Sequence, residues 1–271
     1  MGGLKLLRLQ TDTHIVDRVP AVNTLRKYVL YLWLVFATLV VLIVSTVSRL
    51  GTQRFLHSAT HGVARWWAWG MLRITGTRCH VEGLENIPGT GPYVVMGNHR
   101  SHLDAAVLIY NLPFLFGFIV KQELMKIPIF AGGMRSIGCV AVSRKKSKDD
   151  HAVLDGAAQE VAGGKNILVF PEGTRAPTDD FLPFKKGGVL LAIKAGVPIL
   201  PFGLSGTGKV IPARILTVTP GEVQLNIGTL ISTDGLTIDD RDTVLESVRQ
   251  RIVDLYIPGY PDGAEIQRGD P

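Results

Sequence analysis

The longest apolar stretch in the sequence lies near the N-terminus, where no charged residue occurs from Tyr28 to Ser48. As a helix rising ~1.5 Å per residue, this stretch would match the ~30 Å hydrocarbon core of a bilayer. Lys27 and Arg49 bracket it, and the aromatic residues near its first end are typical of a membrane interface. The pattern predicts a membrane helix, because buried helices of soluble proteins rarely run so long without a charge.

A second stretch, Phe55–Thr75, combines three tryptophans with Arg65 and Arg73. Aromatic and basic residues in one helix are typical of an amphipathic segment that lies in the membrane interface. Positive residues occur on both sides of the first stretch, so charge does not determine its orientation. A two-helix hairpin that enters one leaflet is favoured over a single straight span, and residues 1–75 are predicted to form this anchor.

From Gly76 onward, short β-branched runs alternate with helical stretches. This alternation predicts an α/β fold with a mixed, mostly parallel central sheet flanked by helices. The predicted strands are Cys79–Glu82, Tyr93–Gly97, Gly117–Lys121, Cys139–Ser143, Asn166–Phe170, Ile199–Gly203 and Val223–Ile227. The predicted helices are Ser101–Tyr110, Lys148–Ala162, Gly187–Lys194 and Arg241–Tyr256. We expect a catalytic domain over residues 76–258 and a mobile C-terminal tail over residues 259–271.

The composition is that of a protein that meets lipid. Hydrophobic residues make up 46% and charged residues 19% of the chain, and soluble domains average about 25% charged residues. The net charge of +6 favours an anionic partner, either nucleic acid, an anionic bilayer or a phosphorylated substrate. Cys79 and Cys139 are far apart and outside any Cys/His cluster, so neither a disulfide framework nor a zinc site is predicted. No removable signal peptide is indicated, and a reducing, cytosolic environment fits best.

The segment 98–104 reads Asn-His-Arg-Ser-His-Leu-Asp and follows a predicted strand, at the end where α/β folds present reactive groups. His99 and Asp104 are five residues apart, so a turn into a helix after His99 lets the carboxylate reach one imidazole nitrogen. The other nitrogen is then available as a base, because imidazole titrates near physiological pH. The spacing alone is common by chance, but it suits proton removal from an alcohol that attacks a thioester.

A second polar segment, Phe170–Arg175, reads Phe-Pro-Glu-Gly-Thr-Arg and also follows a predicted strand. The guanidinium of Arg175 can bind a phosphate through two parallel hydrogen bonds, and Gly173 allows the backbone to come close to a ligand. Taken alone, this hexapeptide is better explained by an ordinary turn with a surface ion pair.

Together these segments resemble the glycerolipid acyltransferase family typified by 1-acylglycerol-3-phosphate acyltransferase, which shares four short blocks in a fixed order. The first block, N-H-x-S-x-x-D, is matched by residues 98–104. The second corresponds to residues 138–144, with Ser143 in place of the Asp that usually precedes the final Arg. The third, F-P-E-G-T-R, is matched in full by residues 170–175, and the fourth, V-P-I-x-P, by residues 197–201.

The resemblance implies roles for the residues of these blocks. It implies that His99 acts as general base and that Asp104 orients it. The residues that it implies for binding phosphate groups of the substrates are Arg144, Glu172, Gly173, Thr174, Arg175, Lys121 and Lys185. For the two lysines, an exposed surface side chain is the alternative.

The implied reaction transfers a fatty acyl group from acyl-CoA or acyl carrier protein to the sn-2 hydroxyl of 1-acylglycerol 3-phosphate, which gives phosphatidic acid. It requires no metal and no cofactor besides the thioester co-substrate. The expected partners are the lysophospholipid, the thioester donor and the bilayer, with acyl carrier protein as a further candidate and no nucleic acid. We expect the protein at the cytoplasmic membrane with its catalytic domain facing the cytosol. The alternatives are a sister acyltransferase with another acceptor, a lipid hydrolase or transacylase, and a membrane scaffold, which the intact blocks disfavour.

Three other features suggest different chemistry. Residues 203–209 fit the first seven positions of a P-loop, but Val210 stands where Ser or Thr would hold magnesium, and Pro212 interrupts the expected helix. Ser101 lacks the G-x-S-x-G pattern of a serine nucleophile, so it is expected to cap the following helix. His102 is expected to be a structural or surface residue.

Overall fold

The computed structural model describes residues 18–47, 53–89, 91–126, 131, 134–135, 137–142, 150–214 and 217–262. Within these residues, seven strands form one sheet in the order β1-β7-β6-β2-β5-β3-β4. The strands are β1 Thr77–Glu82, β2 Val94–Gly97, β3 Gly117–Lys121, β4 Val140–Val142, β5 Ile167–Val169, β6 Ile199–Ser205 and β7 Gly221–Ile227. Neighbouring strands are parallel except β6 and β7. The predicted mixed, mostly parallel sheet is therefore confirmed.

The position of each strand in the sheet follows from its sequence pattern. β2 and β6 are buried along their whole length, as strands covered on both faces must be, and both are predominantly apolar. β1 lies at one edge and alternates between half-buried and exposed residues. The first and third sequence blocks, residues 98–104 and 170–175, follow β2 and β5 in the middle of the sheet.

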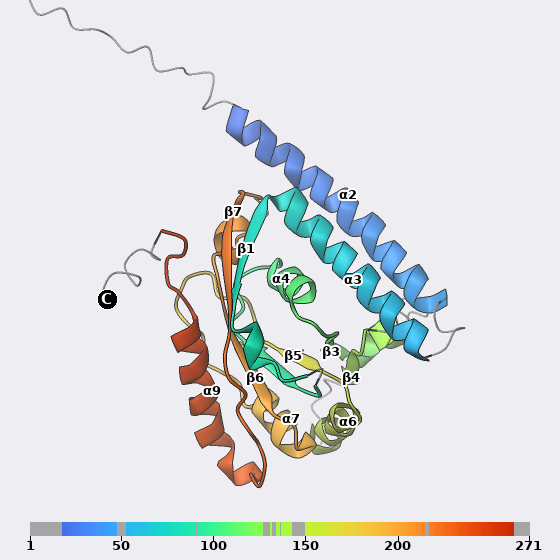
Figure 1. Cartoon of the computed structure of the whole chain (residues 1–271), viewed down its shortest axis with the longest axis vertical. Coiled ribbons are helices and arrows are strands. Elements are labelled where there is room, and N and C mark those ends of the chain that lie inside the picture. Colours follow the sequence, from blue (N-terminus) through green and yellow to red (C-terminus); the bar gives the residue numbers. More distant parts are fainter. Residues whose placement is uncertain are drawn as a thin grey trace, which may run out of the picture.

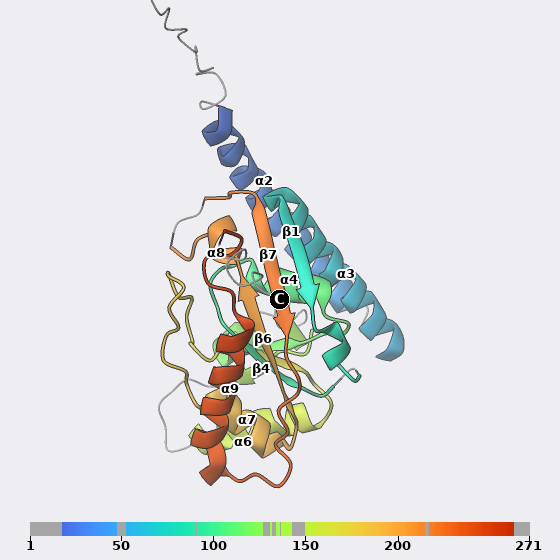
Figure 2. The same ribbon diagram turned by 60° about the vertical axis from the view of Figure 1, so that its left-hand side comes forward.

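Helices cover both faces of the sheet (Figure 1). The described helices are α2 Arg18–Val47, α3 Gln53–Thr75, α4 Asp104–Asn111, α6 Asp150–Ala162, α7 Gly187–Ala195, α8 Thr207–Val210 and α9 Arg241–Leu255, with 3-10 turns at Leu84–Asn86, Gln122–Lys126 and Ile238–Asp240. One apolar core joins α3 and α4 to the sheet, and a second joins α6, α7 and α9 to its other face. Figure 2 shows α9 beside the antiparallel pair β6 and β7.

The two N-terminal helices run antiparallel along the α4 side of the domain (Figure 1). Trp33 joins them: its indole N–H donates to the Trp67 carbonyl at 3.2 Å, and its ring lies 4.6 Å from that of Trp66. Leu30 of α2 is buried in the adjoining core. One segment of α2, Thr24–Val44, is long and apolar enough to cross a membrane, although only 11% of it is buried within the protein.

Some boundaries differ from those predicted. The helix expected from Ser101 begins at Asp104, because residues 101–103 form a turn. β7 pairs antiparallel to β6, an orientation that the strand sequence does not reveal. Residues 259–262 of the predicted tail pack on the domain, where the Gly259 N–H donates to Asp179 at 2.8 Å.

Candidate active site

The first and third sequence blocks meet because the strands that carry them, β2 and β5, are neighbours. β2 and β5 are parallel, with Met96 in register with Val169. The segments after these strands therefore leave the sheet at the same edge, where α/β folds form their sites. The N–H of Ala176 donates to the His99 carbonyl at 2.9 Å and ties the two blocks together.

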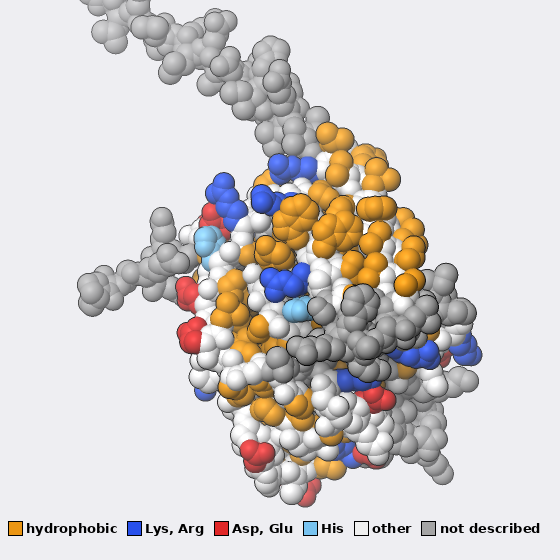
Figure 3. All heavy atoms as spheres, turned by 45° about the vertical axis from the view of Figure 1, so that its right-hand side comes forward, with side chains coloured by type: hydrophobic (Ala, Val, Ile, Leu, Met, Phe, Trp, Pro, Cys, Tyr) orange, Lys and Arg blue, Asp and Glu red, His pale blue; other side chains and the backbone are white. Residues whose placement is uncertain are grey.

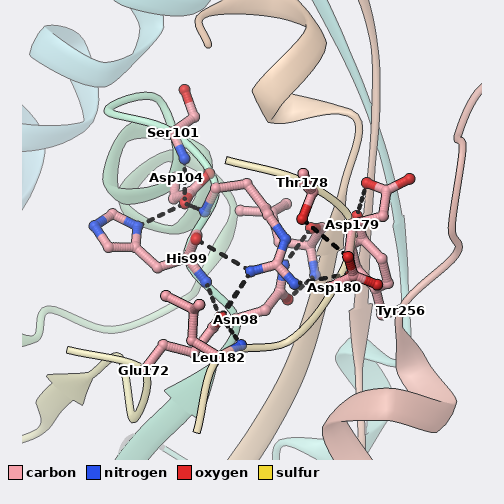
Figure 4. Close-up of polar contacts among 12 residues, drawn as sticks. Asn98, His99, Ser101, Asp104, Glu172, Thr178, Asp179, Asp180, Leu182 and Tyr256 are labelled. Carbon is pink, nitrogen blue, oxygen red and sulfur yellow. Dashed lines mark hydrogen bonds and ion pairs between the residues drawn. The ribbon is translucent and has the colours of Figure 1, made fainter. Parts of the chain in front are cut away.

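His99 and Asp104 form a hydrogen-bonded pair (Figure 4). The His99 Nδ1 lies 2.7 Å from Asp104 Oδ2, which also accepts the N–H groups of Arg100 at 2.7 Å and Ser101 at 2.9 Å. Asp104 is fully buried in the first turn of α4. An ionised carboxylate only accepts hydrogen bonds, so Nδ1 carries the proton and Nε2 presents a lone pair. Figure 4 shows this second nitrogen directed away from Asp104.

Packing determines the plane of the imidazole ring. The Phe170 ring stacks on His99 with centroids 3.9 Å apart and planes 8° from parallel. Phe170 in turn contacts the edge of Phe202 on β6. Asn98 anchors the preceding residue, since its amide donates to the Leu204 carbonyl and accepts the Leu204 N–H, each at 2.8 Å. His99 therefore has few accessible orientations.

Glu172 lies behind His99 within the protein. Its carboxylate accepts the His99 N–H at 3.0 Å, the Leu182 N–H at 2.9 Å and the Arg100 guanidinium at 2.8 Å (Figure 4). The side chain is fully enclosed. The resemblance implied a phosphate-binding role for Glu172, whereas this geometry favours positioning of His99 over direct contact with the acceptor.

The rest of the third block presents cationic groups. Gly173 has φ +72°, and a side chain there would place Cβ 2.4 Å from the Lys185 ammonium nitrogen, which crosses over it. The neighbouring Lys186 instead pairs with Asp242 on α9 at 2.6 Å. Arg175 is half-buried, and its Nη1 is enclosed without a hydrogen-bond partner among the described residues. Thr174 is exposed.

His102 lies close enough to Arg175, His99 and Asp104 for their charges to influence it. Burial lowers its pKa below the ordinary value of 6.5, and the nearby charges of Arg175 and His99 lower it further, against the opposing effect of Asp104. Arg175 and His99 therefore share a neighbour. His102 is exposed, as expected, and its imidazole is neutral at neutral pH.

Two predicted phosphate ligands cannot be placed as side chains. Arg144 lies in residues 143–149, outside the described residues. Lys121 is the last residue of β3, so its backbone reaches the same sheet edge as the blocks after β2 and β5. Its side chain lies outside the described part of the structure.

The structure assigns ordinary roles to the features that suggested other chemistry. Lys209 of the P-loop-like segment donates to the Gly259 carbonyl at 2.7 Å and to Asp262 at 2.9 Å, and α8 is a single turn. Ser101 donates to the Ile211 carbonyl at 2.7 Å. Its hydroxyl also accepts the Leu103 N–H in the turn before α4, so it does not cap the helix itself.

No group of three or more potential metal-ligating side chains occurs among the residues that the structure describes. Cys79 and Cys139 are both free thiols. Burial raises the pKa of each to about 11, so both are protonated at neutral pH. Neither thiol lies in the first or third block, and Cys139 lies in the second.

One buried residue of the site, Arg100, has no counterpart among the sequence-based candidates. It occupies the unspecified third position of the first block, where an arginine looks like any surface residue. The only signal was its adjacency to His99.

The chain matches the family model described as Acyltransferase over residues 78–205. This match and the site geometry define the protein as an acyltransferase. The chain is 34% identical over 190 residues to the mouse 1-acyl-sn-glycerol-3-phosphate acyltransferase alpha, covering 69% of this chain and 67% of the mouse protein. It is 30% identical over 182 residues to the 1-acyl-sn-glycerol-3-phosphate acyltransferase of Borreliella burgdorferi, covering 67% of this chain and 73% of that protein.

A solved structure leads to the same family. The crystal structure of the 1-acyl-sn-glycerophosphate acyltransferase PlsC from Thermotoga maritima superimposes with a TM-score of 0.69 at 29% identity, covering 86% of this chain and 97% of that one. The protein belongs to the 1-acyl-sn-glycerol-3-phosphate acyltransferase family.

Proposed function

We propose that the protein transfers a fatty acyl group from a thioester donor to the sn-2 hydroxyl of 1-acylglycerol 3-phosphate. The products are phosphatidic acid and the free thiol of the donor. The observation that carries this proposal is the His99–Asp104 pair, joined at 2.7 Å, with the His99 carbonyl bonded to the residue that follows Arg175. The names of the relatives support the same acceptor.

Each proton transfer in the proposed mechanism uses the Nε2 nitrogen of His99. Nε2 takes the proton of the acceptor hydroxyl as its oxygen attacks the thioester carbonyl, while Asp104 stabilises the imidazolium. The tetrahedral intermediate then expels the thiolate, which receives the proton from His99. A positioned general base contributes about 10²–10⁴-fold to such a rate.

The cationic groups beside the pair would hold the phosphate of the acceptor. Arg175 has a buried donor without a partner among the described residues, and a phosphate oxygen can accept from it. Lys185 reaches the same block across Gly173. We include Arg144 and Lys121 in this phosphate site on the resemblance alone, and we assign Gly173 the role of leaving room for the ligand and the lysine.

We further propose that α2 and α3 hold the domain at the cytoplasmic membrane, with the site facing the cytosol. Leu32, Val35 and Phe36 of α2 are 73%, 64% and 57% exposed. Figure 3 shows hydrophobic side chains gathered over this side of the molecule. Lipid is the environment in which such a surface is stable. The acceptor can then enter from the bilayer while acyl-CoA or acyl carrier protein arrives from the cytosol.

A panel of acceptors with labelled acyl-CoA tests the proposal. The purified protein in detergent receives 1-acylglycerol 3-phosphate, glycerol 3-phosphate, a lyso-amino-lipid and a lyso-glycolipid, and the products are identified by mass. Phosphatidic acid is the expected product, and His99→Ala abolishes it whereas His80→Ala, at an exposed histidine, does not. Release of free fatty acid only, or full activity of His99→Ala, would refute the proposal.

A further inference from the structure

Arg100 is a buried residue next to His99, and its guanidinium bonds Glu172 and the His99 backbone. The residue is only 4% exposed. Its guanidinium lies between two aromatic rings, 4.9 Å from the Phe181 centroid and 5.2 Å from the Tyr256 centroid. A desolvated guanidinium over an aromatic face is held by cation–π attraction as well as by packing. The two rings therefore form a cage that limits where Arg100 can direct its hydrogen bonds.

These hydrogen bonds are directed at the backbone and support of His99. Arg100 Nη1 donates to both oxygens of Glu172, at 2.8 and 3.0 Å, and to the His99 carbonyl at 3.2 Å. Glu172 itself accepts the His99 N–H at 3.0 Å. One buried ion pair therefore bonds both backbone polar groups of His99, and the Ala176 N–H donates to the same carbonyl.

A segment from the end of the domain holds the cage in place. Tyr256 directly follows α9 and donates its hydroxyl to Asp179, whose carbonyl accepts from Arg100 at 3.3 Å (Figure 4). Burial and the neighbouring Asp179 raise the pKa of Tyr256, so the phenol keeps its proton. The Ile257 N–H donates to Ser205 on β6 at 2.8 Å. Residues 256–262 thus form a strap, which lies outside the matched family region.

We infer that Arg100 is a positioning residue for His99, and that the strap of residues 256–262 maintains its alignment through Tyr256. The inference rests on the proposed role of His99 as base. The guanidinium is suited to this role because Nη1 bonds Glu172 while Nη2 bonds the Asp179 carbonyl, and a single ammonium nitrogen does not provide this spread of donors. Misplacing a catalytic group by about 1 Å costs roughly 10²-fold in rate.

The first test compares Arg100→Met and Arg100→Lys with the exposed control Arg251→Met. We expect Arg100→Met to lower kcat about 10²-fold with both KM values within threefold of wild type, because alignment and not binding is lost. Arg100→Lys restores part of kcat by returning the charge. A folded Arg100→Met with wild-type kcat, or one whose defect lies only in KM, would overturn the inference.

A second pair of variants decides the matter if Arg100→Met fails to fold. Tyr256→Leu removes the ring, whereas Tyr256→Phe removes only the hydroxyl. We expect the Leu variant to lose about tenfold more kcat than the Phe variant, because only the Leu variant loses the cation–π contact with the Arg100 guanidinium. Equal kcat values would contradict the role of the cage.

A double-mutant cycle with Glu172→Gln tests the chain of contacts. If Arg100 acts through Glu172, the double variant is no slower than the slower single variant, because either change already breaks the link. Multiplicative losses would overturn the inference. His99→Ala separates the two proposals: an active His99→Ala refutes the proposed function, whereas an inactive His99→Ala beside a fully active Arg100→Met refutes this inference alone.

Discussion

The surroundings of His99 and the outer face of α2 are stabilised in opposite ways. Around His99, specific hydrogen bonds between individual groups hold the structure together, as in the contacts of Asp104, Glu172 and Arg100. On α2, large apolar side chains such as Leu32 and Val35 face outward, and what they share is exposed area. The first region depends on the identity of each residue, while the second depends on a sum over many residues.

This difference determines how each region responds to substitution. A buried hydrogen-bonded group that loses its partner is left with an unsatisfied charge or dipole, so a single change has a large effect. Apolar surface contributes approximately in proportion to its area, so one change has a small effect and introduced charge has a large one.

The strongest test of the polar region is Asp104→Ala. We expect kcat to fall by about 10³-fold, because the imidazole loses both its orientation and the stabilisation of its charged form. Steady-state assays with the acceptor and labelled acyl-CoA measure the loss. Asp155→Ala, at an exposed aspartate paired with Lys194, is the matched control. A loss below tenfold in a folded Asp104→Ala protein would place the base elsewhere.

A smaller effect is expected for Arg175→Met. A charge-assisted hydrogen bond of ~1.5–3 kcal/mol corresponds to a decrease of roughly 10–100-fold in kcat/KM for the phosphorylated acceptor. The same acceptor without phosphate, 1-acylglycerol, provides the internal control, because its slow acylation does not involve the lost contact. An equal decrease for both acceptors would remove Arg175 from the phosphate site.

Membrane binding tests the apolar region. We expect the triple variant Leu32→Lys, Val35→Lys, Phe36→Lys to bind vesicles at least about tenfold more weakly, because each lysine in a hydrocarbon environment costs ~2.5–3.5 kcal/mol. Co-sedimentation with phosphatidylglycerol-containing vesicles measures this, and Leu84→Lys, at an exposed leucine of the catalytic domain, is the control. Unchanged sedimentation of the triple variant would contradict the proposed membrane contact.

The smallest predicted effect concerns pH. The folded state lowers the pKa of His102, so below the ordinary value of 6.5 the folded protein binds fewer protons than the unfolded chain. This residue therefore destabilises the fold as pH falls through that value. We expect the decrease in Tm between pH 8 and about pH 5 to be shallower in His102→Gln. An identical dependence of Tm on pH in the variant would show that folding does not lower the pKa of His102.

Much of the fold was predictable because strand and helix patterns are local. The bounds of Gly117–Lys121 were predicted to the residue, and the catalytic blocks were placed correctly at strand ends. The start of α4 at Asp104 was not predicted. The turn before it depends on the hydrogen bond from Ser101 to the Ile211 carbonyl, which lies more than a hundred residues away along the chain. The antiparallel orientation of β7 likewise depends on its pairing with β6.

The amino-acid sequence alone determined the α/β class, the apolar helices and the chemistry available at positions 99, 104 and 170–175, because these follow from residue type and short-range spacing. Only the tertiary structure decided that Glu172 faces inward and that the side chain of Lys185, not that of Lys186, lies over Gly173. It also decided that Arg100 is enclosed by Phe181 and Tyr256. Burial and hydrogen-bond partners depend on segments that are distant along the chain and become neighbours only when the sheet forms.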